Sequence, residues 1–347
     1  MVRDGGSGDV PRCSIVPPYV LEALAQAGDA RLARAGHQTI LLTAELAERR
    51  LLLLERGERH LADERRVVYD AVHGRELPGT LLRREGGPAC ADASANAAYE
   101  HAGQTFSFFE RVFGRSSIDG RGMRLLSSVH YGQHYDNAFW DGTEMVYGDG
   151  DGVVLGDFTR ALDVIAHELT HGLTESTANL TYSGQSGALN ESVSDVFGSL
   201  VKQWVHGQRA EEADWLIGDR LLVDTKFGRA LRSLAAPGTA YNSIFMGGKD
   251  PQPAHMRDYQ HMRADDGGVH VNSGIPNHAF YLLAVDLGGH AWERAGAIWF
   301  GALTGAARPH TSFAEFASET VHVAEKQFGD EVRKHVQHAW QRVGVSA

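Results

Sequence analysis

The chain has 347 residues and a formal net charge of −11 at pH 7, and a chain this acidic is not expected to bind nucleic acid. With 43% hydrophobic and 22% charged residues it has the composition of a globular protein, and its length predicts two domains with an additional segment. Its two cysteines, Cys13 and Cys90, are too few for a disulfide framework, so its stability must come from the core or from metals.

The beginning of the chain carries no recognisable export signal. Residues 1–14 contain Gly, Asp and Arg but no apolar stretch of the kind found in signal peptides. The run from Leu51 to Leu54 is far too short to span a membrane. We therefore expect a chain that is cytoplasmic at synthesis, has no membrane partner and, if it is secreted, leaves by a leaderless route.

A helical appendage is predicted at the N-terminus. Pro17 and Pro18 favour an extended conformation, and an extended apolar peptide that includes Tyr19 has a shape that fits a groove. The alternative is a loop that leads into a helix beginning near Tyr19. Residues 38–60 then follow helical periodicity. The strongly charged stretch at residues 58–66 predicts an exposed linker and a cleavage site.

Strand-like segments dominate the next part of the chain, and helical patterns dominate the rest. Residues 67–69 and 123–131 have strand-like patterns, and between them a helix capped by Ser94 or Asn96 is expected to end at Gly114. From Asp214 onward most segments have helical periodicity, separated by long loops. This order predicts an α+β fold with a strand-rich N-terminal domain and a helical C-terminal domain.

A candidate metal site lies in the stretch Asp163-Val-Ile-Ala-His-Glu-Leu-Thr-His171, at the point where strands give way to helices. Residues four apart share a helix face, so His167 and His171 can bind one ion. Glu168 lies about 100° further round the helix, beside the ion, where it can take a proton from a metal-bound water. The alternative is a pair of surface histidines on an amphipathic helix.

A catalytic zinc requires a third protein ligand and an open position for water. Glu191 follows His171 by twenty positions, which leaves room for a turn and a returning helix. Asp195 lies four residues later on the same face and can accept the second ring N–H of one ligating histidine, and Asn190 can do the same for the other. A solvated acidic face is the alternative interpretation of Glu191 and Asp195.

Five motifs make the chain resemble the thermolysin family of zinc endopeptidases. In chain order they are Asn137-Ala-Phe-Trp140, Met145-Val-Tyr-Gly-Asp-Gly-Asp-Gly152, Asp163-Val-Ile-Ala-His-Glu-Leu-Thr-His-Gly172, Gly187-Ala-Leu-Asn-Glu-Ser-Val-Ser-Asp195 and Gly267-Gly-Val-His-Val-Asn-Ser-Gly-Ile-Pro-Asn277. They extend over about residues 65 to 345 in the order and spacing of that family. The stretch Pro17-Pro-Tyr-Val-Leu21 further resembles the protealysin-type subgroup, in which a short propeptide with this motif covers the active site of the precursor.

The resemblance implies a zinc endopeptidase zymogen that cleaves peptide bonds on the amino side of apolar residues. Its domains would be a small helical propeptide at residues 1–60, a strand-rich N-terminal catalytic domain at 61–181 and a helical C-terminal catalytic domain at 182–347. The zinc helix would lie at the junction of the two catalytic domains. Expected partners are peptide or protein substrates and the chain's own propeptide in the active-site cleft, and we expect a monomer.

The resemblance also implies roles for individual residues by matched position. His167, His171 and Glu191 would bind zinc, and Glu168 would be the general base. His270 would stabilise the oxyanion. Asp265 would orient this histidine, and Tyr182 would assist it. Substrate backbone would be bound by Asn137, Ala138 and Arg232. The apolar pocket for the residue after the scissile bond would be lined by Leu155, Phe158, Val164 and Leu231. The inhibitory residues of the propeptide would be Pro17, Pro18 and Tyr19.

The chain departs from this family at the double calcium site that its members often hold. The matching positions are Asp163, Lys202, Asp214, Leu216 and Asp219, and two expected carboxylates are replaced by Lys202 and Leu216. An ammonium group supplies positive charge without the coordination requirements of calcium. We therefore predict that the double calcium site is absent and that Lys202 forms a salt bridge with Asp163 or Asp214, while a single calcium site elsewhere stays open.

Three alternatives remain open from the sequence. Pro11-Arg-Cys13 superficially resembles a cysteine switch, in which a propeptide thiolate occupies the open zinc position in place of Pro17-Pro-Tyr19 in the cleft. A catalytically silent zinc protein that binds peptides would share the zinc ligands, although every catalytic position is filled here. A zinc aminopeptidase would also share them, but its third ligand is usually one residue closer.

Overall fold

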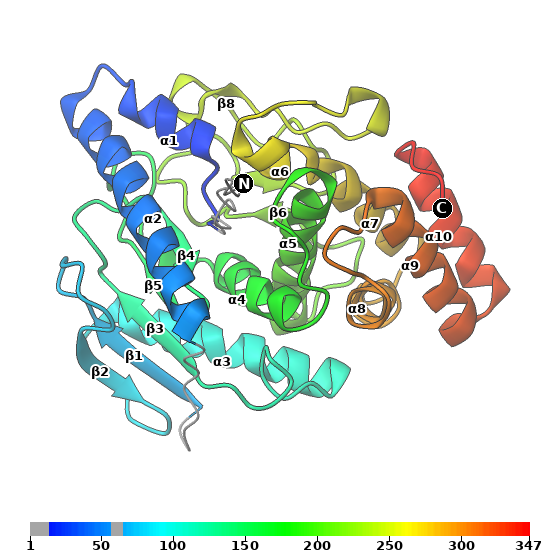
Figure 1. The fold of residues 1–347 in the computed structure, drawn as a ribbon, viewed down its shortest axis with the longest axis horizontal. Coiled ribbons are helices and arrows are strands. Elements are labelled where there is room, and N and C mark those ends of the chain that lie inside the picture. The colour runs from blue at the N-terminus through cyan, green and yellow to red at the C-terminus, as the bar shows by residue number, and fades with distance from the viewer. Residues whose placement is uncertain (1–13, 57–64) are drawn as a thin grey trace, which may run out of the picture.

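The computed structural model describes residues 14–56 and 65–347, and the predicted linker at residues 58–66 lies mostly outside these ranges. Within them, no helix is both long enough and apolar enough to cross a membrane. Figure 1 shows the strands β1 to β5 gathered in one part of the molecule and the C-terminal helices in another, with α4 (Leu162–Ser176) between them. The predicted α+β fold, strand-rich first and helical afterwards, is confirmed.

The N-terminal appendage is a pair of helices, α1 (Pro18–Ala25) and α2 (Ala30–Arg56). The first helix begins with Pro18, whose fixed φ and missing N–H suit the first helical position. The two helices pack closely at Gly36, where a Cβ atom would lie 2.4 Å from the backbone nitrogen of Ala25. The sequence predicts a helix from residue 38, but α2 already begins at Ala30. Its first two turns pack against α1, which accounts for the earlier start.

The strand-rich part is a five-stranded sheet with the order β2-β1-β3-β5-β4. Its parallel pairs are β1 with β3 and β3 with β5, and its antiparallel pairs are β1 with β2 and β4 with β5. The strands are β1 (Arg66–Asp70), β2 (Thr80–Arg84), β3 (Leu125–Val129), β4 (Ala138–Trp140) and β5 (Glu144–Tyr147). Because β4 is an edge strand, its outer side is available to pair with another segment.

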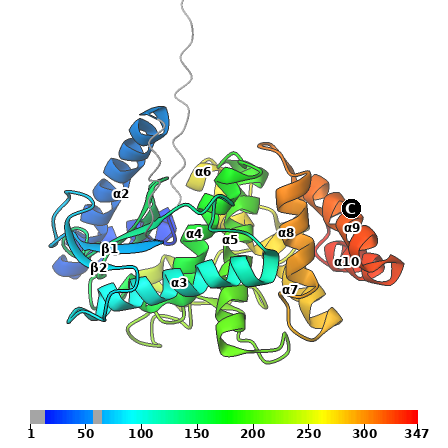
Figure 2. The same cartoon turned by 90° about the horizontal axis from the view of Figure 1, so that it is seen from below.

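Helix α3 (Ala93–Phe113) packs against β1 and β3 and also reaches α4, as Figure 2 shows from below. The predicted end at Gly114 is correct, since this residue has a φ of 65° that glycine adopts without strain. The predicted cap was wrong. Asp92 rather than Ser94 or Asn96 precedes the helix, and its side chain accepts a hydrogen bond from the backbone N–H of Ala95 at 2.8 Å.

The helical part begins with α5 (Gly184–His206), which packs along α4. The two helices approach so closely that a Cβ atom on Gly198 would lie 2.5 Å from the carbonyl oxygen of Asp163. Two short hairpins follow, β6 (Leu216–Ile217) with β7 (Arg232–Ser233) and β8 (Asn242–Ser243) with β9 (Gly248–Lys249). The remaining helices are α6 (Asp265–Asn272), α7 (Gly274–Leu287), α8 (Ala295–Gly305), α9 (Phe313–Phe328) and α10 (Asp330–Arg342).

One continuous apolar core joins the two parts of the molecule. It contains buried side chains from the sheet, from α4 and α5 and from the C-terminal helices. It also contains apolar residues from the N-terminal appendage, among them Ile15, Val16 and Leu24. The appendage therefore packs against the rest of the chain and shares its core. The predicted domain boundaries at residues 60 and 181 stay a prediction.

Candidate active site

Three predicted metal ligands converge between α4 and α5. The Nε2 atoms of His167 and His171 lie 3.1 Å apart, and the carboxylate oxygens of Glu191 lie 3.5 and 3.4 Å from them. Donor atoms bound at about 2.1 Å to one tetrahedral zinc are about 3.4 Å from one another. The side chains are almost completely buried, and no other group of three such residues close enough to hold an ion occurs in residues 14–56 and 65–347. The donor set therefore fits zinc.

The two histidine rings are oriented by hydrogen bonds at Nδ1, the ring nitrogen that does not face the other metal ligands. The Nδ1 atom of His167 lies 2.9 Å from Oδ1 of Asp195, and that of His171 lies 2.9 Å from Oδ1 of Asn190. Both Nδ1 atoms thus donate to an oxygen, which leaves the Nε2 lone pairs facing Glu191. Burial lowers the pKa of His171 to about 3, so this ring is neutral and able to bind a metal. The sequence prediction for Asn190 and Asp195 matches this arrangement.

Glu168 lies one residue after His167 and is completely buried. Its Oε2 accepts a hydrogen bond from the backbone N–H of Trp140 at 3.2 Å, while its Oε1 has no hydrogen-bond partner among the described residues. Burial and the neighbouring charge of Glu191 raise the pKa of Glu168 well above its usual value. A carboxyl group of raised pKa, with a free oxygen beside the metal ligands, suits a group that takes up and returns a proton.

His270 faces this group from the opposite side of the cleft. Its ring Nδ1 is hydrogen-bonded to the carboxylate of Asp265, and its Nε2 lies 3.3 Å from the hydroxyl of Tyr182, which itself donates to Glu191. Burial acts to lower the pKa of His270, but the charges of Glu191 and Asp265 outweigh it and raise this pKa to about 9. The ring is therefore protonated at neutral pH and can donate a hydrogen bond into the cleft.

The position of His270 depends on an unusual turn that periodicity does not predict. Within α6, residues 266–268 have positive φ values of 49°, 90° and 80°. Two of these residues are glycines, which adopt such values without strain. The sequence predicts a glycine-rich loop at this point, whereas the structure continues into a helical turn that carries the histidine.

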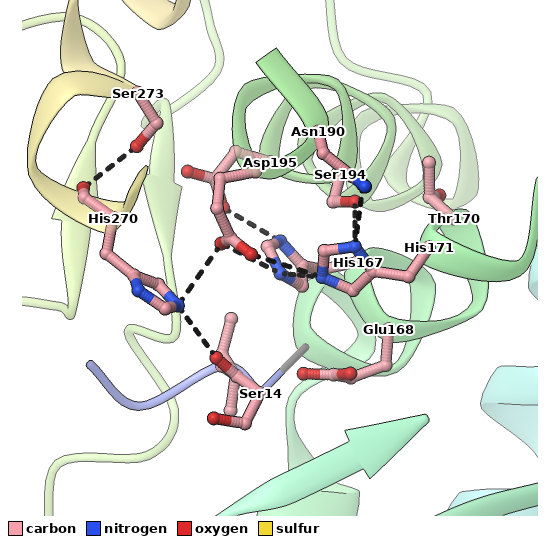
Figure 3. Close-up of polar contacts among 12 residues, drawn as sticks. Ser14, His167, Glu168, Thr170, His171, Asn190, Ser194, Asp195, His270 and Ser273 are labelled. Atoms are coloured by element: carbon pink, nitrogen blue, oxygen red, sulfur yellow. Dashed lines mark hydrogen bonds and ion pairs between the residues drawn. The ribbon is translucent and has the colours of Figure 1, made fainter. Parts of the chain in front are cut away.

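Residues 14–16 of the appendage occupy the cleft. The carbonyl oxygen of Ser14 lies 3.0 Å from Nε2 of His270, and the carbonyl oxygen of Ile15 accepts a hydrogen bond from Nη1 of Arg232 at 3.0 Å. The backbone N–H of Val16 donates to Oδ1 of Asn137 at 3.1 Å. Figure 3 shows the carbonyl of Ser14 directed at His270, with the metal ligands on the far side. Arg232 and Asn137 thus contact peptide backbone.

The predicted pocket residues belong to the same large apolar core as Ile15. Ile15 is completely buried and belongs to one apolar cluster with the four predicted pocket residues. These residues are Leu155, Phe158, Val164 and Leu231. Ala138 contacts the segment through its backbone, because its carbonyl oxygen accepts a 3.4 Å hydrogen bond from the N–H of Ile15.

Pro17, Pro18 and Tyr19 lie beside the cleft. Pro17 and Pro18 form the start of α1, and the hydroxyl of Tyr19 accepts a hydrogen bond from Tyr241 at 3.1 Å. The residues that contact the predicted catalytic and substrate-binding groups are 14–16, which belong to the extended stretch Cys13–Leu21 considered for a groove but precede the three residues predicted to be inhibitory. Their only signal is the apolar pair directly before the prolines. Cys13 lies outside the described residues.

Asp195 connects the metal ligands with the substrate-binding arginine. Besides His167, its carboxylate accepts two hydrogen bonds from Arg232, both at 2.8 Å, and one from Nδ2 of Asn277 at 2.8 Å. Burial opposes ionisation, but the charge of Arg232 and the hydrogen bond with His167 outweigh it and hold the pKa of Asp195 well below its usual range. The sequence predicted the contact with His167 but not those with Arg232 and Asn277.

Lys202 occupies the position of the replaced calcium ligand. Its Nζ lies 3.1 Å from the nearest oxygen of each of three carboxylates, those of Asp163, Asp214 and Asp219. It also donates to the carbonyl oxygen of Leu216 at 2.8 Å. The predicted salt bridge was to Asp163 or to Asp214, and both are present.

Comparisons with known proteins extend this picture to the whole chain. The family model "Thermolysin metallopeptidase, catalytic domain" matches residues 49–175, and the model "Thermolysin metallopeptidase, alpha-helical domain" matches residues 178–345. An extracellular metalloprotease of Pectobacterium carotovorum subsp. carotovorum is 48% identical over 337 residues, which are 96% of this chain and 97% of the relative. Protease PrtS of Photorhabdus sp. (strain Az29) is 49% identical over 284 residues, 81% of this chain and 76% of the relative.

A solved structure is similar over nearly the same length. It is described as the precursor of protealysin, a metalloproteinase from Serratia proteamaculans, and it matches with a TM-score of 0.87 and 47% sequence identity. The match covers 96% of this chain and 99% of that chain.

Proposed function

Because this chain belongs to the thermolysin family of metallopeptidases, we propose that it cleaves peptide bonds on the amino side of apolar residues. It is a zinc endopeptidase in its precursor form. The substrate preference is supported by Ile15, whose backbone carbonyl is bound by Arg232 and whose side chain is buried in the apolar core that also contains the predicted pocket residues. The alternative of a catalytically silent protein that binds peptides is not favoured.

The proposed mechanism assigns one task to each group in the cleft. His167, His171 and Glu191 would hold a zinc ion, which would supply positive charge beside the reacting carbonyl and lower the pKa of the attacking water. Glu168 accepts a proton from that water and passes it to the nitrogen of the leaving amine. His270 donates a hydrogen bond to the carbonyl oxygen as negative charge develops on it, and the adjacent Tyr182 assists.

The similarity to a precursor structure supports a propeptide bound to the catalytic domain, and we propose that this propeptide inhibits the precursor. We propose that helix α2 holds the propeptide in place through two arginines. Arg49 forms a 2.8 Å ion pair with Glu144, and Arg50 donates to the carbonyl oxygen of Trp140 and to Glu175, both at 3.0 Å. These contacts anchor the helix beside β4, the strand that borders the occupied cleft.

A protein digest tests the proposed activity directly. After removal of the propeptide, the enzyme should cut casein at internal bonds that precede apolar residues, and a zinc chelator should abolish this cleavage. Mass spectrometry of the peptides identifies the residue on each side of every cut. Trimming from the ends would instead indicate an aminopeptidase, and an uncut substrate with bound zinc would indicate the silent peptide binder.

We propose further that Lys202 replaces calcium in stabilising the loop after α5. Burial opposes its charge, but the three surrounding carboxylates outweigh this and raise the pKa of Lys202 above its usual value. A calcium-selective chelator should then leave the thermal unfolding temperature almost unchanged. Lys202→Ala should lower the free energy of unfolding by about 3 kcal/mol, because Asp163 would remain buried without its partner. A large loss of stability on chelation of calcium in the native chain would contradict the proposal.

A matched variant separates this effect from a general loss of surface charge. Lys226 is two-thirds exposed and forms an ion pair with Asp224, two residues earlier in the chain and half-exposed itself. Lys226→Ala should change the free energy of unfolding by less than about 1 kcal/mol, as is usual for exposed ion pairs. Equal effects of the two substitutions, measured by urea denaturation, would show that the charge cluster around Lys202 has no special role.

A further inference from the structure

The propeptide segment in the cleft runs as an additional strand beside β4. Ser14 pairs with Phe139 in an antiparallel bridge, and the N–H of Ile15 donates to the carbonyl oxygen of Ala138. The N–H of Val16 is bound by the side chain of Asn137. These contacts fix the direction of the segment and the position of each of its residues relative to the catalytic groups.

Two successive carbonyl groups of this segment meet different partners. The carbonyl oxygen of Ser14 lies 3.0 Å from Nε2 of His270, the donor that the proposed mechanism places at the reacting carbonyl. The carbonyl oxygen of Ile15 is bound by Arg232 at 3.0 Å, one residue further along. In Figure 3 the carboxylate of Glu168 points toward Ser14 from the side opposite His270. The groups that act on a substrate therefore surround the bond between Ser14 and Ile15.

The side chains agree with this register. Ile15 is the residue that follows the bond, and it is completely buried in the large apolar core, to which Val16 and the predicted pocket residues also belong. An apolar residue in this position is what the proposed specificity requires. A segment placed one residue earlier or later would put Ser14 or Val16 there and would bring a different carbonyl to His270.

We propose that the Ser14–Ile15 peptide bond lies in the position of a scissile bond and is the first site at which the zinc-loaded precursor cleaves itself. This inference rests on the proposed function. In the reaction, the oxygen of water bonds to the carbonyl carbon of Ser14, and the bond from that carbon to the nitrogen of Ile15 breaks. Glu168 passes one proton of the water to this nitrogen, and the second proton, released when the new acid ionises, is taken up by the same amine, which leaves a carboxylate on Ser14 and an ammonium group on Ile15.

Cleavage at this bond does not by itself open the cleft. The chain from Ile15 onward remains attached through α1 and through the ion pairs of Arg49 and Arg50 on α2. Leu42 and Leu46 of α2 are also buried against Tyr135 in a second apolar cluster. The expected product is therefore a shortened precursor that is still inhibited, and a later cut beyond α2 is needed for release.

The test follows the mass of the full-length chain. It is purified in the presence of a chelator and then supplied with zinc, and samples are denatured at intervals for intact-mass analysis. The first new species should be a chain that begins at Ile15 and the peptide that ends at Ser14. The rate constant of this first cleavage should not depend on protein concentration, because the segment lies in the cleft of its own chain. A Glu168→Ala chain mixed with the wild type should stay intact at this bond.

Two variants of Ile15 test the register. Ile15→Leu should be cleaved at the same bond, whereas Ile15→Asp should be cleaved at least about tenfold more slowly, because its carboxylate cannot be accommodated in the apolar pocket. Docking is measured separately in the uncleavable Glu168→Ala chain by hydrogen exchange. There the amides of Ile15 and Val16 should be protected, and Ile15→Asp should remove this protection.

The outcomes distinguish this inference from the proposed function. A chain that digests casein after release of its propeptide but first cleaves itself elsewhere, with Ser14–Ile15 intact, overturns the inference alone. Cleavage of Ser14–Ile15 that depends on protein concentration overturns its intramolecular part. A zinc-loaded chain that cuts neither casein nor itself overturns both.

Discussion

Replacement of Glu168 by alanine should leave zinc binding intact and reduce the hydrolysis of peptides by at least about 10²- to 10⁴-fold, the usual contribution of a general base. Among the described residues, the carboxylate of Glu168 makes no contact with the three metal ligands that would hold these ligands in place. Among residues 14–56 and 65–347, its one hydrogen bond is from the N–H of Trp140 at 3.2 Å. The three ligand side chains and their supports, Asn190 and Asp195, stay in position without it.

The measurement combines metal analysis with peptide kinetics on the processed enzyme. Bound zinc should remain at one ion per chain, while kcat falls and KM changes little, because Asn137 and Arg232, which bind the backbone of residues 15 and 16 and which we propose to bind substrate backbone, are unchanged. Glu175→Gln is a matched control on the same helix, since its carboxylate pairs with Arg50 of the propeptide and with no group of the proposed mechanism. Wild-type turnover by Glu168→Ala would refute the proposed mechanism.

The metal ligands could be predicted from the sequence because they depend on helical spacing. Two histidines four residues apart must share a face of α4, and Asn190, Glu191 and Asp195 lie within five positions on α5. Once α4 and α5 pack together, these spacings alone bring all five side chains to one place. The resemblance to a known family then supplied His270 and Arg232, which no local pattern indicated.

The occupant of the cleft could not be predicted in the same way. Ser14, Ile15 and Val16 carry no catalytic or charged group, and they interact mainly through backbone atoms. Their position depends on pairing with an edge strand 120 or more residues later in the chain, and such pairing leaves little trace in local sequence. The bonds from Asp195 to Arg232 and Asn277 are similarly remote, since they join α5 to β7 and α7.

Asp195 is the residue whose loss should affect stability and metal binding together. It is completely buried and accepts hydrogen bonds from His167, Arg232 and Asn277. Asp195→Asn keeps the shape but removes the charge, so the guanidinium of Arg232 is left buried without a counter-ion. We expect the free energy of unfolding of the zinc-free chain to fall by about 3 to 5 kcal/mol. Zinc affinity should fall by about 10- to 100-fold, because His167 loses its orienting carboxylate.

The pH dependence of this loss has a definite sign. The pKa of Asp195 is lower in the folded chain than in the unfolded one, so its contribution is fully present above pH ~4 and decreases as the pH falls through the folded value. The difference in stability between Asp195→Asn and the native chain should therefore be constant from about pH 6 to 8 and should shrink only in stronger acid. Urea denaturation of the zinc-free proteins at a series of pH values measures it.

A second variant separates the two consequences of losing Asp195. Asn190 orients His171 as Asp195 orients His167, but its side chain has no contact with Arg232. Asn190→Ala should therefore weaken zinc binding by a similar factor, measured by competition with a chelator, while it costs only about 1 kcal/mol of stability in the zinc-free chain. If both variants lost the same stability, the charge pair of Asp195 with Arg232 would not be what holds α5 and β7 together. If Asp195→Asn and Asn190→Ala differed only in zinc affinity, the carboxylate of Asp195 would contribute to metal binding alone.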